Sequence, residues 1–253
     1  KPTKTRKMPT TKLTQRGYTV RKDELTDAQL TAIRNDLRVT PLNPTKERLL
    51  QQRKQWYPNE DHTTDDEDSF NVYQENAAKL YLPPFYAVAT FGKPDTNTLL
   101  TRGAPTNLLF HGTLRPQQLD VADRTVAHLN AHGGGILQLR CGFGKTIIAL
   151  HLFARLKLKT LVLVHKEFLM NQWRERIAQF LPDAKVGTLQ AKVCDVAGRD
   201  IVLGMLQSVA TGKYPSEAYT DFGVCCFDEC HHLGAKMFSR AMSIGRTRYM
   251  LGL

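Results

Sequence analysis

The stretch GGGILQLRCGFGKTII, residues 133–148, decides the fold that we predict for this chain. Residues 136–139 form a short apolar run bounded by glycines, which is typical of a buried strand. A glycine-containing loop then leads to Lys145 and Thr146, which open an apolar segment that we expect to be a helix. Strand, glycine loop and helix start together predict a phosphate-binding loop, because backbone amides and a helix N-terminus attract phosphate oxygens.

The phosphate-binding pattern lacks one glycine. The full motif, GxxxxGK[ST], requires glycine at position 139, where this chain has leucine, so that only GxGKT remains. In such a loop the lysine reaches the terminal phosphates, and the threonine hydroxyl is placed to ligate Mg²⁺. The residues that we predict to bind a nucleotide here are Gly142, Phe143, Gly144, Lys145 and Thr146.

Charge and composition restrict the class of protein. The net charge of +11 favours a polyanionic partner, nucleic acid before an anionic membrane surface, although a merely basic surface is the alternative. No apolar run approaches the length that spans a membrane. The five cysteines are irregularly spaced and odd in number, which predicts reduced thiols and an intracellular location.

The chain divides into three predicted parts. Residues 1–22 hold eight Lys or Arg and no acid, and we expect a flexible basic tail there, with a possible short strand at 18–20. We expect an accessory domain over 23–105, with a helix capped by Thr26, a strand near 70–73, an extended aromatic segment at 80–86 and an exposed acidic loop at 59–68. The loose stretch 92–105 separates it from a domain over 106–253.

The last part alternates strands and helices. We expect helices beginning near 116 and 145 and another over 167–180. Apolar strands are predicted at 160–164, 186–189, 201–205, 224–227 and from 249. This alternation predicts an α/β fold, a parallel sheet covered by helices on both faces, with ligands at the carboxyl ends of the strands.

A second chemical motif follows the strand at 224–227. Asp228 and Glu229 end a buried strand some 80 residues after Lys145, and such an acidic pair suits nucleotide hydrolysis, one carboxylate holding Mg²⁺ and the other activating water. Zinc is the alternative, because cysteines and histidines crowd here. We reject it, since Cys225 and Cys226 are adjacent on a strand and point to opposite faces.

These motifs resemble the DEAD/DEAH-like helicases of superfamily two. GFGKT followed by DECHH carries the resemblance, LRPQQ (114–118) looks like the adenine-recognising Q motif, and VHKEFLMNQW (164–173) is similar to motif Ia of the XPB-like branch. IVLGMLQS (201–208) resembles the strand-end motif that touches nucleic acid. FDECHHLGA is similar to motif II of helicases of large DNA viruses, relatives of the poxvirus transcript-release helicase.

The resemblance implies a RecA-like lobe that binds ATP with Mg²⁺ and tracks DNA or RNA. It assigns Lys145, Asp228 and Glu229 to catalysis, and Thr146 with Asp228 to the metal. Gln118 would recognise adenine. The implied nucleic-acid contacts are His165, Lys166, Gln172, Gln207 and Ser208.

The resemblance also implies a partner lobe. RYMLGL (248–253) would continue into motif III, so motifs III to VI and a second RecA-like lobe are expected outside these residues. Residues 1–253 alone would then hydrolyse ATP hardly at all. A viral protein of this kind would act in the host cytoplasm, the nucleus or the virion.

Two other classes stay open from the residues alone. A nucleotide kinase shares the GKT helix but needs an acceptor pocket and lid arginines, and does not need LRPQQ or the motif Ia segment. A catalytically incomplete nucleic-acid-binding module is the other. Nucleic-acid-stimulated ATP turnover separates a helicase from a kinase, and loss of Lys145 without loss of function would favour the binding module.

Overall fold

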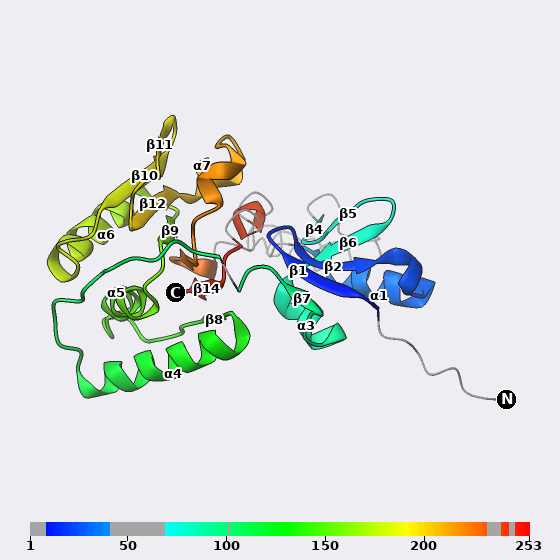
Figure 1. Ribbon diagram of the computed structural model, residues 1–253, viewed down its shortest axis with the longest axis horizontal. Coiled ribbons are helices and arrows are strands. Elements are labelled where there is room, and N and C mark those ends of the chain that lie inside the picture. Colours follow the sequence, from blue (N-terminus) through cyan, green and yellow to red (C-terminus); the bar gives the residue numbers. More distant parts are fainter. Residues whose placement is uncertain (1–8, 41–68, 101, 232–238, 243–245) are drawn as a thin grey trace, which may run out of the picture.

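The computed structural model describes residues 9–40, 69–100, 102–231, 239–242 and 246–253. Two main sheets organise these residues, a five-stranded sheet built from the first hundred residues and a seven-stranded sheet built from residue 134 onward (Figure 1). No helix among the described residues is long and apolar enough to cross a membrane.

The five-stranded sheet has the order β5-β6-β2-β1-β7, in which only the β1–β7 pair is parallel. Its strands are β1 (Thr11–Thr14), β2 (Gly17–Arg21), β5 (Gln74–Glu75), β6 (Lys79–Leu82) and β7 (Thr96–Asn97). Helices α1 (Asp27–Asp36) and α3 (Pro84–Phe91) bury their apolar faces against it. A 3₁₀ turn η1 (Lys22–Glu24) and a two-stranded pair, β3 (Arg38–Val39) with β4 (Phe70–Asn71), also belong to this part.

Local capping explains where α1 begins. The Thr26 hydroxyl accepts a hydrogen bond from the Gln29 backbone N–H at 3.3 Å, and the Gln29 side chain accepts one from the Thr26 N–H at 3.0 Å. This reciprocal capping box satisfies two amides that a helix start leaves unpaired. The predicted N-cap is confirmed.

Several predictions for the N-terminal half are wrong. The tail expected over 1–22 contains β1 and β2, because Leu13, Tyr18 and Val20 are buried in the core of the five-stranded sheet. The segment 80–86 was expected to be extended throughout. Instead β6 ends at Leu82 and α3 begins at Pro84, since proline suits the first turn of a helix. Of the strand expected near 70–73, the structure has only the two residues of β4, Phe70 and Asn71. Residues 1–8 and the acidic loop at 59–68 lie outside the described residues.

The seven-stranded sheet has the order β11-β10-β12-β9-β13-β14-β8 and is parallel except for β11. Its strands are β8 (Gly134–Ile136), β9 (Thr160–Val164), β10 (Val186–Gln190), β11 (Val193–Asp195), β12 (Ile201–Met205), β13 (Val224–Phe227) and β14 (Tyr249–Gly252). The strand expected at 136–139 is therefore shifted, because β8 lies on the two glycines before it and ends at Ile136.

Helices cover both faces of this sheet, as predicted (Figure 1). On one face α4 (Pro116–His132), α5 (Lys145–Leu156) and α6 (Glu167–Phe180) enclose a core that includes Leu129, Phe153 and Trp173. On the other, α7 (Leu206–Ala210) and the 3₁₀ turn η3 (Ser216–Tyr219) pack over a second cluster. In β13, Cys225 enters the second cluster and Cys226 the first, so these two thiols do point to opposite faces.

Arg246 joins the two sheets. It lies just before β14 and donates hydrogen bonds to the backbone carbonyls of Gln15 and Arg16, in the turn between β1 and β2. Burial lowers the pKa of Arg246 to about 10. The turn is fitted to this side chain, because Gly17 has a φ of +123° and a Cβ added there would lie 2.7 Å from Arg246 Nη1 and 2.8 Å from the Leu82 carbonyl.

Replacement of Gly17 by alanine tests this fit. We expect Gly17→Ala to lower the free energy of unfolding by about 2–4 kcal/mol, because backbone strain and a steric conflict act together. Gly198→Ala is the matched control, since Gly198 also has a positive φ, +66°, but open space around an added Cβ, and it should cost about 1 kcal/mol. Equal losses in urea unfolding of the two variants would contradict the close approach of Arg246.

Candidate functional site

The GKT loop leads into a helix whose first turn is open. After β8 the chain reaches Gly142 and Gly144, which have φ values of +74° and +98°, and α5 begins at Lys145 with no side chain capping its N-terminus. The first intrahelical hydrogen bond runs from Ile148 N–H to the Gly144 carbonyl, at 3.0 Å. The preceding amides and the positive end of the helix dipole therefore suit an anion such as a phosphate group.

Gln118 and Arg115 brace this loop from α4. Gln118 is buried, its Nε2 donates to the Phe143 carbonyl at 2.8 Å, and its Oε1 accepts from the Arg115 N–H at 3.0 Å. Arg115 Nη2 donates to the same Phe143 carbonyl at 2.9 Å. A Cβ at Gly144 would lie 2.6 Å from Gln118 Nε2, so glycine is required there on steric as well as conformational grounds. Sequence reasoning found Gln118 but missed Arg115, although both lie in LRPQQ.

The motif II carboxylates follow the end of β13. The Asp228 N–H donates to the Leu163 carbonyl at 2.9 Å, which continues the pairing of β13 with β9 by one residue. Asp228 Oδ1 accepts from the Glu229 N–H at 3.1 Å, and Oδ2 accepts from Trp173 Nε1 at 2.8 Å. Glu229 has a left-handed φ of +53°, an uncommon conformation for this residue type and one that occurs often at functional sites.

Both motifs converge on Cys230. Burial raises the pKa of its thiol, the Glu229 and Asp228 carboxylates raise it too, and the Lys145 ammonium lowers it. Lys145, Asp228 and Glu229 therefore all lie close enough to this half-buried thiol to influence its pKa. Within the described part of the chain, no protein group accepts a hydrogen bond from the Lys145 ammonium. Lysine, the Thr146 hydroxyl at the helix start and the Asp228 carboxylate fit a nucleotide phosphate with a hard cation, which prefers oxygen ligands.

Four of the five predicted nucleic-acid contacts lie together at the same sheet edge. His165 and Lys166 follow β9, and Gln207 and Ser208 open α7 after β12. Gln207 Nε2 donates to the His165 carbonyl at 2.7 Å, which joins the two strand ends. Ser208 Oγ accepts from the Ala191 N–H at 3.1 Å, which adds the turn between β10 and β11.

Gln172 stands apart from this group. It is exposed in the second turn of α6, and among the described residues no hydrogen bond or ion pair links it to the other four. Phe168, in the first turn, was missed by sequence reasoning: it is 54% exposed, and Lys166 Nζ lies 5.9 Å from its ring centroid. An exposed aromatic ring beside a lysine in motif Ia is a recognisable signal for a base-stacking surface.

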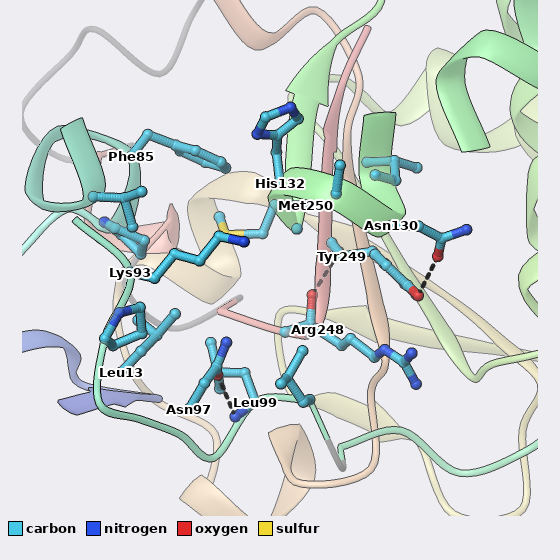
Figure 2. Close-up of a pocket in the computed structure, with 18 of the residues that line it drawn as sticks. Leu13, Phe85, Lys93, Asn97, Leu99, Asn130, His132, Arg248, Tyr249 and Met250 are labelled. Atoms are coloured by element: carbon cyan, nitrogen blue, oxygen red, sulfur yellow. Dashed lines mark hydrogen bonds between the residues drawn. The ribbon is translucent and has the colours of Figure 1, made fainter. Parts of the chain in front are cut away.

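A cavity of about 530 Å³ lies away from these motifs (Figure 2). It lies between the five-stranded sheet with α3 and the end of α4 with the start of β14. Figure 2 shows Tyr249 donating a hydrogen bond to Asn130 in its wall, at 2.7 Å. Because this cavity is at the amino ends of β8 and β14, the P-loop and motif II at their carboxyl ends do not line it. The labelled lining residues are Leu13, Phe85, Lys93, Asn97, Leu99, Asn130, His132, Arg248, Tyr249 and Met250.

Comparisons with known proteins agree with this geometry. A protein of Acanthamoeba polyphaga mimivirus named as an ATP-dependent RNA helicase is 34% identical over 244 residues, which is 96% of this chain and 44% of the relative. A protein of Frog virus 3 named as a helicase is 32% identical over 141 residues, 56% of this chain and 33% of the relative. The chain thus spans less than half the length of these viral relatives.

A solved structure shares the fold of both sheets. The UvsW helicase from bacteriophage T4 superimposes with a TM-score of 0.57 at 17% identity, over 90% of this chain and 86% of that one. At this identity the likeness concerns the fold alone. Together with the viral relatives, it confirms the predicted RecA-like lobe and the predicted resemblance to helicases of large DNA viruses.

The family match covers the residues that carry the site. Residues 111–253, more than half of the chain, match the family described as type III restriction enzyme, res subunit, or ResIII. These residues include LRPQQ, the GKT loop, motif Ia and motif II. Family membership implies the use of ATP. The chain therefore belongs to the ResIII family, and residues 111–253 form a helicase-like ATPase domain of that type.

Proposed function

We propose that this chain binds ATP with Mg²⁺ between the GKT loop and motif II, and that it hydrolyses ATP together with a second RecA-like lobe to move along DNA or RNA. The observation that supports this best is that the GKT loop and motif II follow the carboxyl ends of two parallel strands, β8 and β13, which lie on either side of β14. A kinase would not require the strand-end group of His165, Lys166, Gln207 and Ser208, to which this proposal gives no part in binding the nucleotide.

Each residue of the nucleotide site has a distinct task in this proposal. The open amides of α5 and the Lys145 ammonium hold the phosphates, and the Thr146 hydroxyl and Asp228 carboxylate hold Mg²⁺. The bound cation would offset the negative charge on the transferring phosphoryl group. Glu229 orients the attacking water and accepts its proton.

Gln118 connects adenine recognition to the loop. Its amide already bonds to Phe143 and Arg115, and one further hydrogen and one further lone pair remain after these contacts. We propose that the remaining polar capacity faces the adenine, so that base recognition and loop conformation depend on one side chain. Arg115, at the N-cap of α4, donates a hydrogen bond to the same Phe143 carbonyl.

The strand-end group would contact the backbone of the nucleic acid. His165, Lys166, Gln207 and Ser208 lie on neighbouring strand ends, and the chain carries a net charge of +11. Contacts of this kind are made mainly to phosphates and carry little sequence information. Gln172 would contact the nucleic acid only if the bound strand extends along α6.

We further propose that the residues up to 105 form an accessory domain, with its first strand at Thr11 rather than at the predicted boundary of 23. Its core is separate from the two clusters of the seven-stranded sheet. The viral relatives and the reduced cysteines favour action in the host cytoplasm, the nucleus or the virion.

Lys145→Ala should weaken the binding of ATP with Mg²⁺ by tenfold to a hundredfold, because loss of a charge-assisted contact costs about 1.5–3 kcal/mol. Lys93→Ala is the matched control, since Lys93 is an exposed lysine at the cavity on the other edge of the sheet. Titration calorimetry measures both. Unchanged affinity in a folded Lys145→Ala protein would refute the P-loop assignment and favour a nucleic-acid-binding module.

Nucleic-acid affinity should fall steeply with salt and differ little between unrelated sequences, because binding to phosphates releases counterions. Lys166→Ala should weaken binding to all sequences alike and reduce the slope of log affinity against log salt by about one. Fluorescence anisotropy with single-stranded DNA and RNA of matched sequence measures this, again with Lys93→Ala as the control. Affinity that hardly changes with salt would indicate base-specific recognition instead.

A polypeptide of residues 1–253 alone should bind ATP measurably but release phosphate very slowly, with or without nucleic acid. In two-lobed motors an arginine finger that stabilises the transferring phosphoryl group is worth on the order of 10³–10⁵ in rate, and the resemblance implies such arginines on the second lobe. Addition of that lobe should restore stimulated turnover, and Glu229→Gln should abolish it. Robust stimulated turnover by residues 1–253 would show that one lobe contains the complete site.

A further inference from the structure

A buried tryptophan holds the motif II carboxylate. Trp173 is 1% exposed and donates its indole N–H to Asp228 Oδ2 at 2.8 Å. A hydrogen bond to an ionised carboxylate is shorter and stronger than a neutral one. The other oxygen, Oδ1, accepts from the Glu229 N–H, so that both oxygens of this carboxylate are fixed by protein donors.

Trp173 also contacts the helix of the GKT loop. Its ring stacks on Phe153 of α5, with centroids 6.1 Å apart and an angle of 19° between the planes. Both rings belong to the core between the helices and the sheet. One side chain thus contacts the helix that begins at Lys145 and the carboxylate that follows β13.

The helix that carries Trp173 begins at the nucleic-acid surface. α6 starts at Glu167, directly after His165 and Lys166, and Trp173 lies seven residues beyond Lys166, about 10 Å along the helix axis. In the described part of the chain, the Trp173–Asp228 bond is the one side-chain hydrogen bond that joins α6 to the segment after β13. The Asp228 carboxylate is thus bonded to the helix whose N-cap is Lys166.

We propose that Trp173 is a positioning residue that orients Asp228 for Mg²⁺ and couples the state of the nucleotide site to the nucleic-acid end of α6. This inference rests on the proposed function of the two sites. Core packing alone does not explain why position 173 is a tryptophan, because phenylalanine would fill most of the same space without needing a polar partner. The proposal gives the indole N–H a role. Asp228 keeps lone pairs that Trp173 and Glu229 do not use, and these would be available to a cation.

The first test is Trp173→Phe, which keeps an aromatic ring and removes the N–H donor. We expect the variant to bind ATP in EDTA as the unaltered chain does. In the presence of Mg²⁺ it should bind ATP about tenfold more weakly than the unaltered chain. Nucleic-acid affinity should also stop responding to adenylyl imidodiphosphate with Mg²⁺. A purely structural role would weaken nucleotide binding equally with and without Mg²⁺, and that result would overturn the inference.

The second test does not depend on the folding of Trp173→Phe. The chain has two tryptophans, so Trp56→Phe leaves Trp173 as the only tryptophan, whose emission is measured with excitation that tyrosine does not absorb. Its fluorescence should change when adenylyl imidodiphosphate and Mg²⁺ are added together, and Asp228→Asn should abolish the change. Emission that is insensitive to the bound nucleotide would refute the coupling while leaving the proposed function intact. Failure of the unaltered chain to bind the nucleotide at all, by calorimetry, would refute the proposed function instead.

Discussion

The parallel register of three central strands is the constraint on which both candidate sites depend. β13 pairs with β9 and β14 so that Phe227 lies beside Leu163 and Gly252. Because the strands run the same way, the residues that follow them emerge at one edge of the sheet. A slip of one residue would exchange the faces of Cys225 and Cys226 and carry Asp228 away from the GKT loop.

Sequence reasoning located the central strands well, because strands of a parallel sheet are buried on both faces and appear as continuous apolar runs. Thr160–Val164, Ile201–Met205 and Val224–Phe227 have the predicted bounds, as does the helix Glu167–Phe180. The short strand expected at 18–20 lies within β2, whereas β1 was missed because it buries one face only and basic residues dominate the composition there. Non-local pairing, which makes Leu13 and Val20 part of a core, has no local signature.

In the candidate site, too, the local motifs were predicted and the long-range contacts were not. The GKT loop and the acidic pair are local patterns with known chemistry, so the sequence was sufficient to predict them. The contacts that orient them are long-range: Arg115 and Gln118 reach Phe143 across more than twenty residues, and Trp173 reaches Asp228 across 55. Such contacts depend on how α4 and α6 pack on the sheet, and residue type alone does not reveal them.

One short strand links the candidate nucleotide site to the five-stranded sheet. β14 lies between β8, which leads to the GKT loop, and β13, which leads to motif II. At its carboxyl end the Leu253 carbonyl accepts from the Cys230 N–H at 3.1 Å, beside Asp228 and Glu229. Just before its amino end, Arg246 holds the turn between β1 and β2. The segment from Arg246 to Leu253 therefore contacts motif II at one end and the N-terminal sheet at the other.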